Sequence, residues 1–371
     1  MTRVLVTGGA GFVGSHVVDR LVAEGYDVTV LDSLAEQVHD GEPDYCNDDA
    51  EYVWGDVRDR ELMTELLSDA DVVNHQAGAV GVGQSMYEIE HYVDVNTLGT
   101  ARLLDIVVNE GIDLDRIVVA SSMSIYGEGR YECPDCGDPR YPSLREDEQL
   151  ERGEWEHRCE ACGTALAPTP TPEDKPLDST SIYAITKKDQ EQMVRTVGRA
   201  YDIPTVALRY FNIYGSRQSL DNPYTGVCAI FSSRITNGNP PLVFEDGEQT
   251  RDFIHVSDVA RANQAAIESD ADDVAVNVGT GEPKSIRSIA ETLIDLYGAD
   301  LAPEVTGDYR AGDIRHCYAD TTRAEELLDF EPEVGFEEGM RELVGWAEQQ
   351  DAEDRFEQAH SELEEQGLVG E

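Results

Sequence analysis

The stretch that decides the fold is Thr7-Gly8-Gly9-Ala10-Gly11-Phe12-Val13-Gly14. It follows a short apolar run, Arg3 to Thr7, and precedes Phe12 to Glu24, where apolar residues recur at helical spacing. In a strand–turn–helix of this kind, glycines allow a tight turn and let the backbone approach a pyrophosphate. The N-terminus of the helix adds free N–H groups and the positive end of the helix dipole. The motif predicts a dinucleotide site whose candidate residues are Gly8, Gly11, Phe12, Val13 and Gly14.

Two further positions refine the cofactor prediction. Asp32 follows the second expected strand, Asp27 to Leu31, where a carboxylate accepts hydrogen bonds from a ribose diol and repels a 2′-phosphate. The sequence therefore predicts NAD rather than NADP. Asp56 and Val57 follow the third expected strand, from which a side chain can reach an adenine edge. An exposed turn aspartate is the alternative interpretation of Asp56.

Strand-like and helix-like stretches alternate through the first part of the chain. Further strands are expected to end near Val53, His75 and Ala120, with helices between them. Strands separated by helices pair in parallel, so we expect an α/β fold with a Rossmann-type doubly wound sheet. We expect a dinucleotide-binding domain over 1–128, a cysteine-rich insert over 129–172, and a return to the sheet with a long helix over 173–212. A smaller, mainly substrate-binding domain with minor returns to the sheet should follow over 213–350. Residues 351–371 should form an acidic tail, either a solvated helix or a frayed end.

The charge of the chain excludes several partners. Asp and Glu number 76 against 28 Lys and Arg, which gives a net charge of −48. Such a chain repels a phosphate backbone or an anionic membrane surface, so nucleic acids and membranes are not expected partners. Only four cations are lysines, and 40% of residues are hydrophobic. This pattern predicts a folded, carboxylate-covered protein from a salt-accumulating (halophilic) cytoplasm, with no signal peptide.

Two hydroxyl-bearing motifs contain candidate catalytic side chains. In Tyr183-Ala-Ile-Thr-Lys187 the phenol and the amine lie one helical turn apart on the same face. A nearby ammonium lowers the pKa of a phenol, which makes Tyr183 a candidate general base, and Lys187 can also reach the nicotinamide ribose. Ser121 to Gly127 follows the fifth strand, at the sheet edge where such folds bind ligands. A hydroxyl there can contact a sugar hydroxyl and the tyrosine.

Four cysteines form two C-x-x-C pairs, Cys133 with Cys136 and Cys159 with Cys162, with 22 residues between the pairs. This spacing approaches that of a zinc ribbon, and four thiolates leave no open coordination position. The sequence therefore predicts a structural zinc site, with a redox pair or unliganded thiols as the alternatives.

The motifs together resemble the extended short-chain dehydrogenase/reductase family of nucleotide-sugar enzymes. The matching segments are "TGGAGFVGSH", "SSMSIYG", "YAITK", "RYFNIYG", "RDFIHVSDVA" and "NVGTG". The resemblance implies a tightly held NAD, a homodimer formed through helices near 85–110 and 182–201, and a catalytic role for Ser122. It also implies that Ala77, Gly78 and Asn96 line the cofactor or support the active site, that Asn212 contacts substrate, and that Arg251 and Arg310 clamp a nucleotide diphosphate.

The resemblance also narrows the reaction. Related dehydratases and decarboxylases carry acids in the loop where this chain has Met123 and Ser124, so elimination and decarboxylation are disfavoured. Oxidation at C4 followed by return of the hydride to the other face, which is epimerisation, remains. The insert and the segments "NPYTGVCAIFSSRI" and "RAGDIRHCYAD" are most similar to dTDP-L-rhamnose 4-epimerases. UDP-glucose or UDP-glucuronate 4-epimerisation, a net NAD(P)H-dependent reductase of 4-keto sugars, and a catalytically silent family member remain as alternatives.

Overall fold

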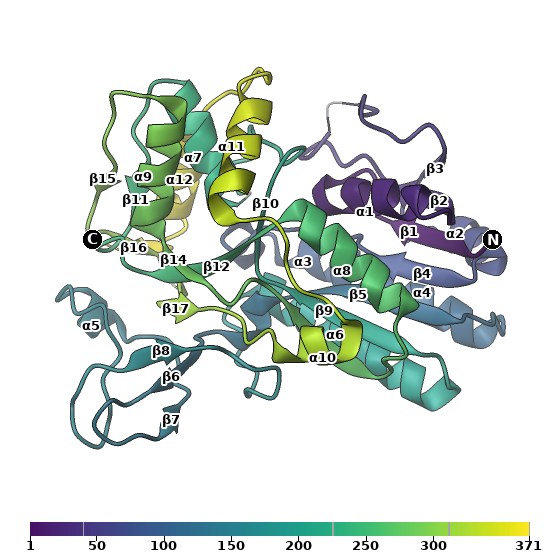
Figure 1. Ribbon diagram of the computed structural model, residues 1–371, viewed down its shortest axis with the longest axis horizontal. Coiled ribbons are helices and arrows are strands. Elements are labelled where there is room, and N and C mark those ends of the chain that lie inside the picture. Colours follow the sequence, from purple (N-terminus) through teal and green to yellow (C-terminus); the bar gives the residue numbers. More distant parts are fainter. Residues whose placement is uncertain (40, 225, 311, 371) are drawn as a thin grey trace.

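A seven-stranded parallel sheet forms the centre of the molecule (Figure 1). The computed structural model describes residues 1–39, 41–224, 226–310 and 312–370. In spatial order the strands are β13 (Val274–Val278), β9 (Thr205–Tyr210), β5 (Arg116–Ser122), β4 (Val72–His75), β1 (Arg3–Thr7), β2 (Asp27–Asp32) and β3 (Glu51–Trp54). The predicted doubly wound sheet is confirmed.

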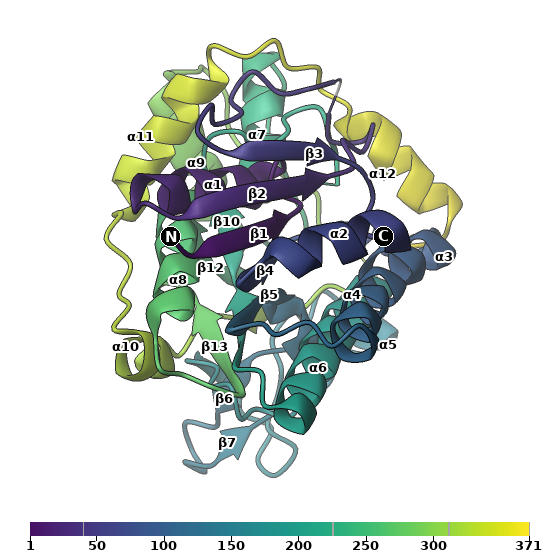
Figure 2. The same ribbon diagram turned by 90° about the vertical axis from the view of Figure 1, so that its right-hand side faces the viewer.

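Helices cover both faces of this sheet (Figure 2). Alternate residues of each strand point to opposite faces, so Val4 and Val6 belong to one hydrophobic core and Leu5 to the other. The first core is closed by α1 (Phe12–Ala23), α8 (Val256–Glu268) and α10 (Thr322–Leu328). The second is closed by α2 (Arg60–Asp69), α4 (Gly99–Asn109) and α6 (Ile182–Tyr201). Burial on both sides explains why the strands are almost continuously apolar.

The strand order reverses at β1, which pairs with β2 on one side and β4 on the other. In doubly wound sheets the loops beyond the carboxyl ends of the strands separate at such a point and leave room for a ligand. The glycine turn after β1 and the segment after β4 therefore begin side by side.

A second, smaller unit is built around the sheet β10-β12-β14, with β17 paired to β12. Its strands are β10 (Asn212–Tyr214), β12 (Thr250–His255), β14 (Pro283–Ser285) and β17 (His316–Cys317). The helices α7 (Val227–Thr236), α9 (Ile286–Tyr297) and α11 (Phe336–Ala347) supply its core. A separate parallel pair is formed by β11 (Leu242–Val243) and β15 (Glu304–Val305). The chain returns to the main sheet through α8, β13 and α10.

The cysteine-rich segment forms its own small antiparallel sheet, seen at the lower left of Figure 1. Its elements are β6 (Arg130–Glu132), β7 (Pro139–Arg140), α5 (Asp147–Leu150) and β8 (Ala167–Thr169). Because β8 pairs with β6, the chain re-enters the main body beside the point where it left.

The acidic C-terminal segment forms a helix, one of the two expected possibilities, but this helix is not fully solvated. It forms α12 (Phe356–Glu365), in which Ala359 and Leu363 are buried, and then β18 (Val369–Gly370), which pairs with β16 (Tyr309–Arg310). Its sequence does not reveal this packing, because its apolar residues are few, although they lie on one side of the helix. Within the described residues, no helix is long and apolar enough to cross a membrane.

Candidate active site and cysteine cluster

The glycine turn between β1 and α1 is shaped to receive a large ligand. Gly8 has φ +71°, and a Cβ added to it would lie 2.7 Å from the backbone nitrogen of Ala77. A Cβ on Gly14 would lie 2.0 Å from the carbonyl oxygen of Gly8. The N-cap residue of α1, Gly11, provides no side-chain hydrogen bond. The N–H groups of the first turn, at Phe12 and Val13, are therefore not capped by that residue, and such groups suit a pyrophosphate.

Asp32 is buried beside this turn. One carboxylate oxygen accepts from the N–H of Ala10 (3.0 Å) and the other from the N–H of Leu34 (2.9 Å). The same side chain that would accept from a ribose diol thus also fixes the glycine turn.

Asp56 is engaged by a neighbouring arginine. Its carboxylate accepts from the Arg58 guanidinium, and this hydrogen bond lowers the pKa of Asp56. Val57 is 7% exposed and lies against Gly99. A role of either residue at an adenine edge stays a prediction.

The segment after β4 connects the glycine turn to the candidate catalytic lysine. A Cβ on Gly78 would lie 3.2 Å from Asn96 Oδ1 and 3.8 Å from Lys187 Nζ. Asn96 accepts from the N–H of Ala79 (2.7 Å) and donates to Thr186 Oγ1 (3.0 Å) on α6. The structure thus brings together Ala77, Gly78 and Asn96, the residues expected near the cofactor. Asn96 is buried, and its hydrogen bonds fix the segment after β4 to α6.

The start of α6 is fixed by two serines. Ser181 caps the helix by accepting from the N–H of Ala184 (3.1 Å). The buried Ser85 accepts from the N–H of Tyr183 (3.0 Å). Ser85 could not be found from the sequence, because no spacing rule connects it to a helix almost a hundred residues later.

Ser122, Tyr183 and Lys187 form the candidate catalytic group, and all three are less than a tenth exposed. Burial raises the pKa of Tyr183, and a hydrogen bond with the Ser122 hydroxyl lowers it. Burial also lowers the pKa of Lys187 to about 7. Ser124 Oγ donates to Ser122 Oγ (2.9 Å), so the Ser122 hydroxyl can donate its own proton to a different acceptor. The arrangement can transfer a proton between a bound hydroxyl and the phenol.

A buried ion pair holds the serine loop against the catalytic helix. Glu191 on α6 accepts from Ser121 Oγ (2.7 Å) and from Arg209 Nε (2.9 Å). Arg209 also donates to the Tyr126 hydroxyl (2.8 Å). In the sequence, Arg209 and Tyr126 stand out only as members of the motifs "RYFNIYG" and "SSMSIYG". Their structural role is to fix Ser122 beside Tyr183.

The three expected substrate residues lie in the second unit. Asn212 Oδ1 is buried without a hydrogen-bond partner, so it can accept a hydrogen bond from a ligand. The Arg251 guanidinium donates to the carbonyl oxygens of Thr250, Ile314 and Arg315. Arg310 pairs with Asp313 (2.9 Å) and remains 42% exposed. The two arginines are therefore joined through residues 313–315.

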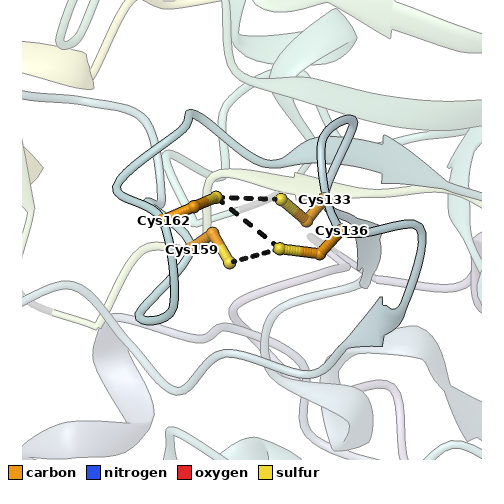
Figure 3. A group of neighbouring side chains, drawn as sticks. All are labelled: Cys133, Cys136, Cys159 and Cys162. Atoms are coloured by element: carbon orange, nitrogen blue, oxygen red, sulfur yellow. Dashed lines mark hydrogen bonds between the residues drawn. The ribbon is translucent and has the colours of Figure 1, made fainter.

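The four cysteines of the insert converge (Figure 3). The Sγ atoms of Cys133 and Cys162 lie 3.5 Å apart, and those of Cys136 lie 3.9 Å from Cys159 and 3.7 Å from Cys162. A tetrahedron of sulfurs each about 2.3 Å from a zinc ion has edges of about 3.8 Å. The spacing fits a metal and is too long for disulfides.

Each cysteine pair lies in a backbone turn of the same kind. Gly137 and Gly163, which follow the pairs, have φ of +72° and +76°. Each donates its N–H to the carbonyl oxygen of the first cysteine of its pair, at 2.8 Å and 2.7 Å respectively. Backbone N–H groups of Ala161 and Cys162 lower the pKa of Cys159 to about 6, which favours the thiolate that binds metals.

Comparison with known proteins agrees with this geometry. Residues 4–146 match the model of the NAD-dependent epimerase/dehydratase family, and residues 160–343 match that of GDP-mannose 4,6-dehydratase. A dTDP-L-rhamnose 4-epimerase of Burkholderia thailandensis is 36% identical over 353 residues, 94% of this chain and 95% of the relative. This chain belongs to the NAD-dependent epimerase/dehydratase family. The predicted resemblance to nucleotide-sugar epimerases, which are isomerases, is confirmed.

Solved structures of this family are similar along nearly the whole chain. The UDP-glucose 4-epimerase of Thermotoga maritima with UDP-glucose has a TM-score of 0.77 and 31% identity, covering 93% of this chain and 98% of that one. The UDP-glucose 4-epimerase of Thermus thermophilus in complex with NAD has a TM-score of 0.73 and 29% identity, covering 94% and 99%. The family uses NAD, and the glycine turn described above fits that cofactor.

Proposed function

We propose that this protein is an NAD-dependent nucleotide-sugar 4-epimerase that interconverts dTDP-L-rhamnose and dTDP-6-deoxy-L-talose. The observation that carries the reaction is the pairing of Tyr183 with Ser122, next to a loop that holds Met123 and Ser124. Neither of these two side chains is a carboxylic acid or carboxylate, so the loop lacks the acid–base group that an elimination would use.

Each side chain of the site has a distinct role in this reaction. NAD, which the glycine turn after β1 and the carboxylate of Asp32 would hold, would supply reversible hydride chemistry at C4 of the sugar. Tyr183 removes the proton of the 4-hydroxyl and later gives it back, and the Ser122 hydroxyl orients the oxygen. In its charged form, which its pKa of about 7 allows up to near neutral pH, Lys187 would favour the phenolate form of Tyr183. Asn212 accepts a hydrogen bond from the substrate, and Arg251 and Arg310 bind its diphosphate, for which a planar guanidinium is well suited.

The sugar is proposed from two kinds of similarity. The insert and the segments 222–235 and 310–320 resemble dTDP-L-rhamnose 4-epimerases, and the Burkholderia relative with that name aligns over nearly the full chain. The Thermotoga structure, which contains UDP-glucose, supports UDP-glucose or UDP-glucuronate 4-epimerisation as the second candidate.

An NMR assay of a nucleotide-sugar panel, in high salt and without added cofactor, tests the proposal. We expect dTDP-L-rhamnose to epimerise and Tyr183→Phe to abolish turnover while the protein still holds NAD. Turnover of UDP-sugars alone would refute the assignment of dTDP-L-rhamnose as substrate, but the assignment of a 4-epimerase reaction would stand. A nucleotide-free protein that needs NADPH would indicate the reductase, and no conversion of any sugar would indicate a silent family member.

We also propose that the four insert cysteines bind one structural zinc ion. Cys133 and Cys159 are buried, Cys136 and Cys162 are exposed, and the set fills a tetrahedral shell without an open position. Metal analysis of the purified protein should find about one zinc per chain. Cys162→Ser should lose it, and Cys46→Ser, outside the cluster, should keep it. A zinc-free protein with four titratable thiols would refute this site.

A further inference from the structure

A cluster of five charged side chains, three of them buried, lies where the cysteine insert meets the second unit. From the insert come Arg145 and Glu156, and from the second unit come Glu245, Asp246 and Arg315. Arg145 and Arg315 each have a side chain only 1% exposed. Glu245, at 3%, accepts from both of them. Nothing in the proposed chemistry uses these groups directly.

Arg315 is the centre of this cluster. Its Nε and one terminal nitrogen donate to Glu156 Oε1 (2.9 and 2.6 Å). The terminal nitrogens also donate to Glu245 Oε2 (2.9 Å) and to both oxygens of Asp246 (2.7 and 3.0 Å). The five N–H donors of the guanidinium are thereby satisfied. Burying so much charge is unfavourable unless the partners are fixed in place, so removing one partner leaves the others uncompensated.

The main chain beside Arg315 holds the candidate diphosphate arginine. Arg251 donates to the carbonyl oxygens of Ile314 (2.6 Å) and Arg315 (3.0 Å). On the insert side, Arg145 donates to the carbonyl oxygen of Asp313 (3.1 Å). The carboxylate of Asp313 in turn pairs with Arg310. Residues 313–315 are therefore held from one side by the insert and from the other by the two arginines.

We propose that Arg315 is a positioning residue that fastens the cysteine insert to residues 313–315, so that the metal-bound insert sets the affinity for the nucleotide diphosphate. The inference rests on the proposed function, because it assigns the diphosphate to Arg251 and Arg310. It predicts an effect on substrate binding and none on proton transfer, since Tyr183 and Ser122 belong to the other unit.

The test breaks the contact from the insert side. Glu156 has a side chain 40% exposed, so Glu156→Gln removes the negative charge that this side chain presents to Arg315 and to His316 with little risk to folding. We expect KM for the nucleotide sugar and the calorimetric Kd for dTDP or UDP to rise about tenfold, the size expected when a charge-assisted hydrogen bond becomes a neutral one. The kcat and the amount of bound NAD should not change. Arg315→Lys, which keeps the charge but loses the fork, should fall between wild type and Arg315→Met.

Two comparisons separate this role from general destabilisation. Arg152→Gln, at an insert arginine 58% exposed and paired only with Glu154 among the described residues, should leave KM and Kd unchanged. Cys162→Ser should raise Kd as Glu156→Gln does. The Kd of the double variant should be no higher than that of either single variant, because both substitutions break the same connection between the insert and residues 313–315. An unchanged Kd in Glu156→Gln, or effects that multiply, would overturn the inference. Binding of neither diphosphate would overturn the substrate assignment as well.

Discussion

At the scale of single residues, the phenol of Tyr183 depends on its neighbours for its acidity. Burial raises its pKa, and the Ser122 hydroxyl opposes that rise. Lys187, itself buried, has a pKa lowered to about 7 and therefore changes charge near neutral pH. The rate of a reaction that uses the phenolate should rise with pH, because deprotonation of Tyr183 is required.

This argument gives a prediction for Ser122→Ala. Without the hydroxyl, the pKa of Tyr183 moves up, so the rising limb of the pH–rate profile should shift to higher pH. The loss of an oriented hydroxyl should also reduce kcat by about a hundredfold. Steady-state kinetics from mildly acidic to alkaline pH measure both effects. Ser122→Thr, which keeps the hydroxyl, should retain most activity, and an unchanged profile in the alanine variant would contradict the assigned role.

At the scale of elements, a buried polar chain joins two strands to two helices. His75 on β4 forms hydrogen bonds with Thr7 Oγ1 on β1 (2.7 Å) and Thr100 Oγ1 on α4 (2.9 Å). Thr100 also accepts from Gln190 on α6 (2.8 Å). Burial, and then the charge of Lys187, lower the pKa of His75 to about 3. The network therefore holds the catalytic helix at the strand reversal only while His75 is neutral.

The sign of the pH effect follows from this pKa. Between pH 6.5 and about 3 the unfolded chain binds a proton at His75 that the folded chain does not, so stability falls as pH falls. His75→Gln should be less stable than wild type at neutral pH. Its deficit should shrink by about 1.4 kcal/mol for each pH unit below about 6.5. Urea unfolding of both proteins at several pH values from neutral down to about 5 measures the gap, and a constant gap would contradict the prediction.

At the scale of the whole molecule, the helices named for dimerisation carry exposed apolar side chains. Ile89, Val93 and Leu98 are 49%, 41% and 39% exposed, and Ile185 on α6 is 43% exposed. Ile89 belongs to α3 (Ile89–Tyr92), which contacts α6. Such a patch on a chain covered with carboxylates favours burial against a second copy. The homodimer remains a prediction.

The double substitution Ile89→Lys with Val93→Glu should convert the dimer to a monomer, because it places charges in the apolar patch. Sedimentation velocity in high salt measures the mass. A wild-type monomer, or a variant that stays dimeric, would contradict this interface. Retained circular dichroism would show that the variant is folded.

The charge of −48 gives a second prediction at this scale. Repulsion among surface carboxylates should destabilise the fold at low ionic strength, and screening should relieve it. The Tm should rise by at least about 5 °C between about 0.1 and about 2 M KCl, which corresponds to a few kcal/mol for a chain of this size. Sucrose at equal osmolality should raise it less. A Tm that is flat or falling with salt would contradict the halophilic interpretation.

The sequence by itself determined what short-range chemistry fixes. The glycine turn, the carboxylate of Asp32, the Tyr183–Lys187 spacing and the paired cysteines are each encoded within a few residues, because turn sterics and helical periodicity act locally. These local features were sufficient to predict the doubly wound sheet, the NAD cofactor and the family.

Only the tertiary structure decided how those features are held. Glu191 joins Ser121 across 70 positions, Arg145 joins Glu245 across 100, and Arg315 joins Glu156 across 159. No periodicity relates such partners, since a buried charge requires only that its counter-charge be close in space. In a chain with 76 acidic residues, the sequence cannot show which few are buried. For the same reason the acidic C-terminal segment was expected to be solvated, whereas α12 packs against the body.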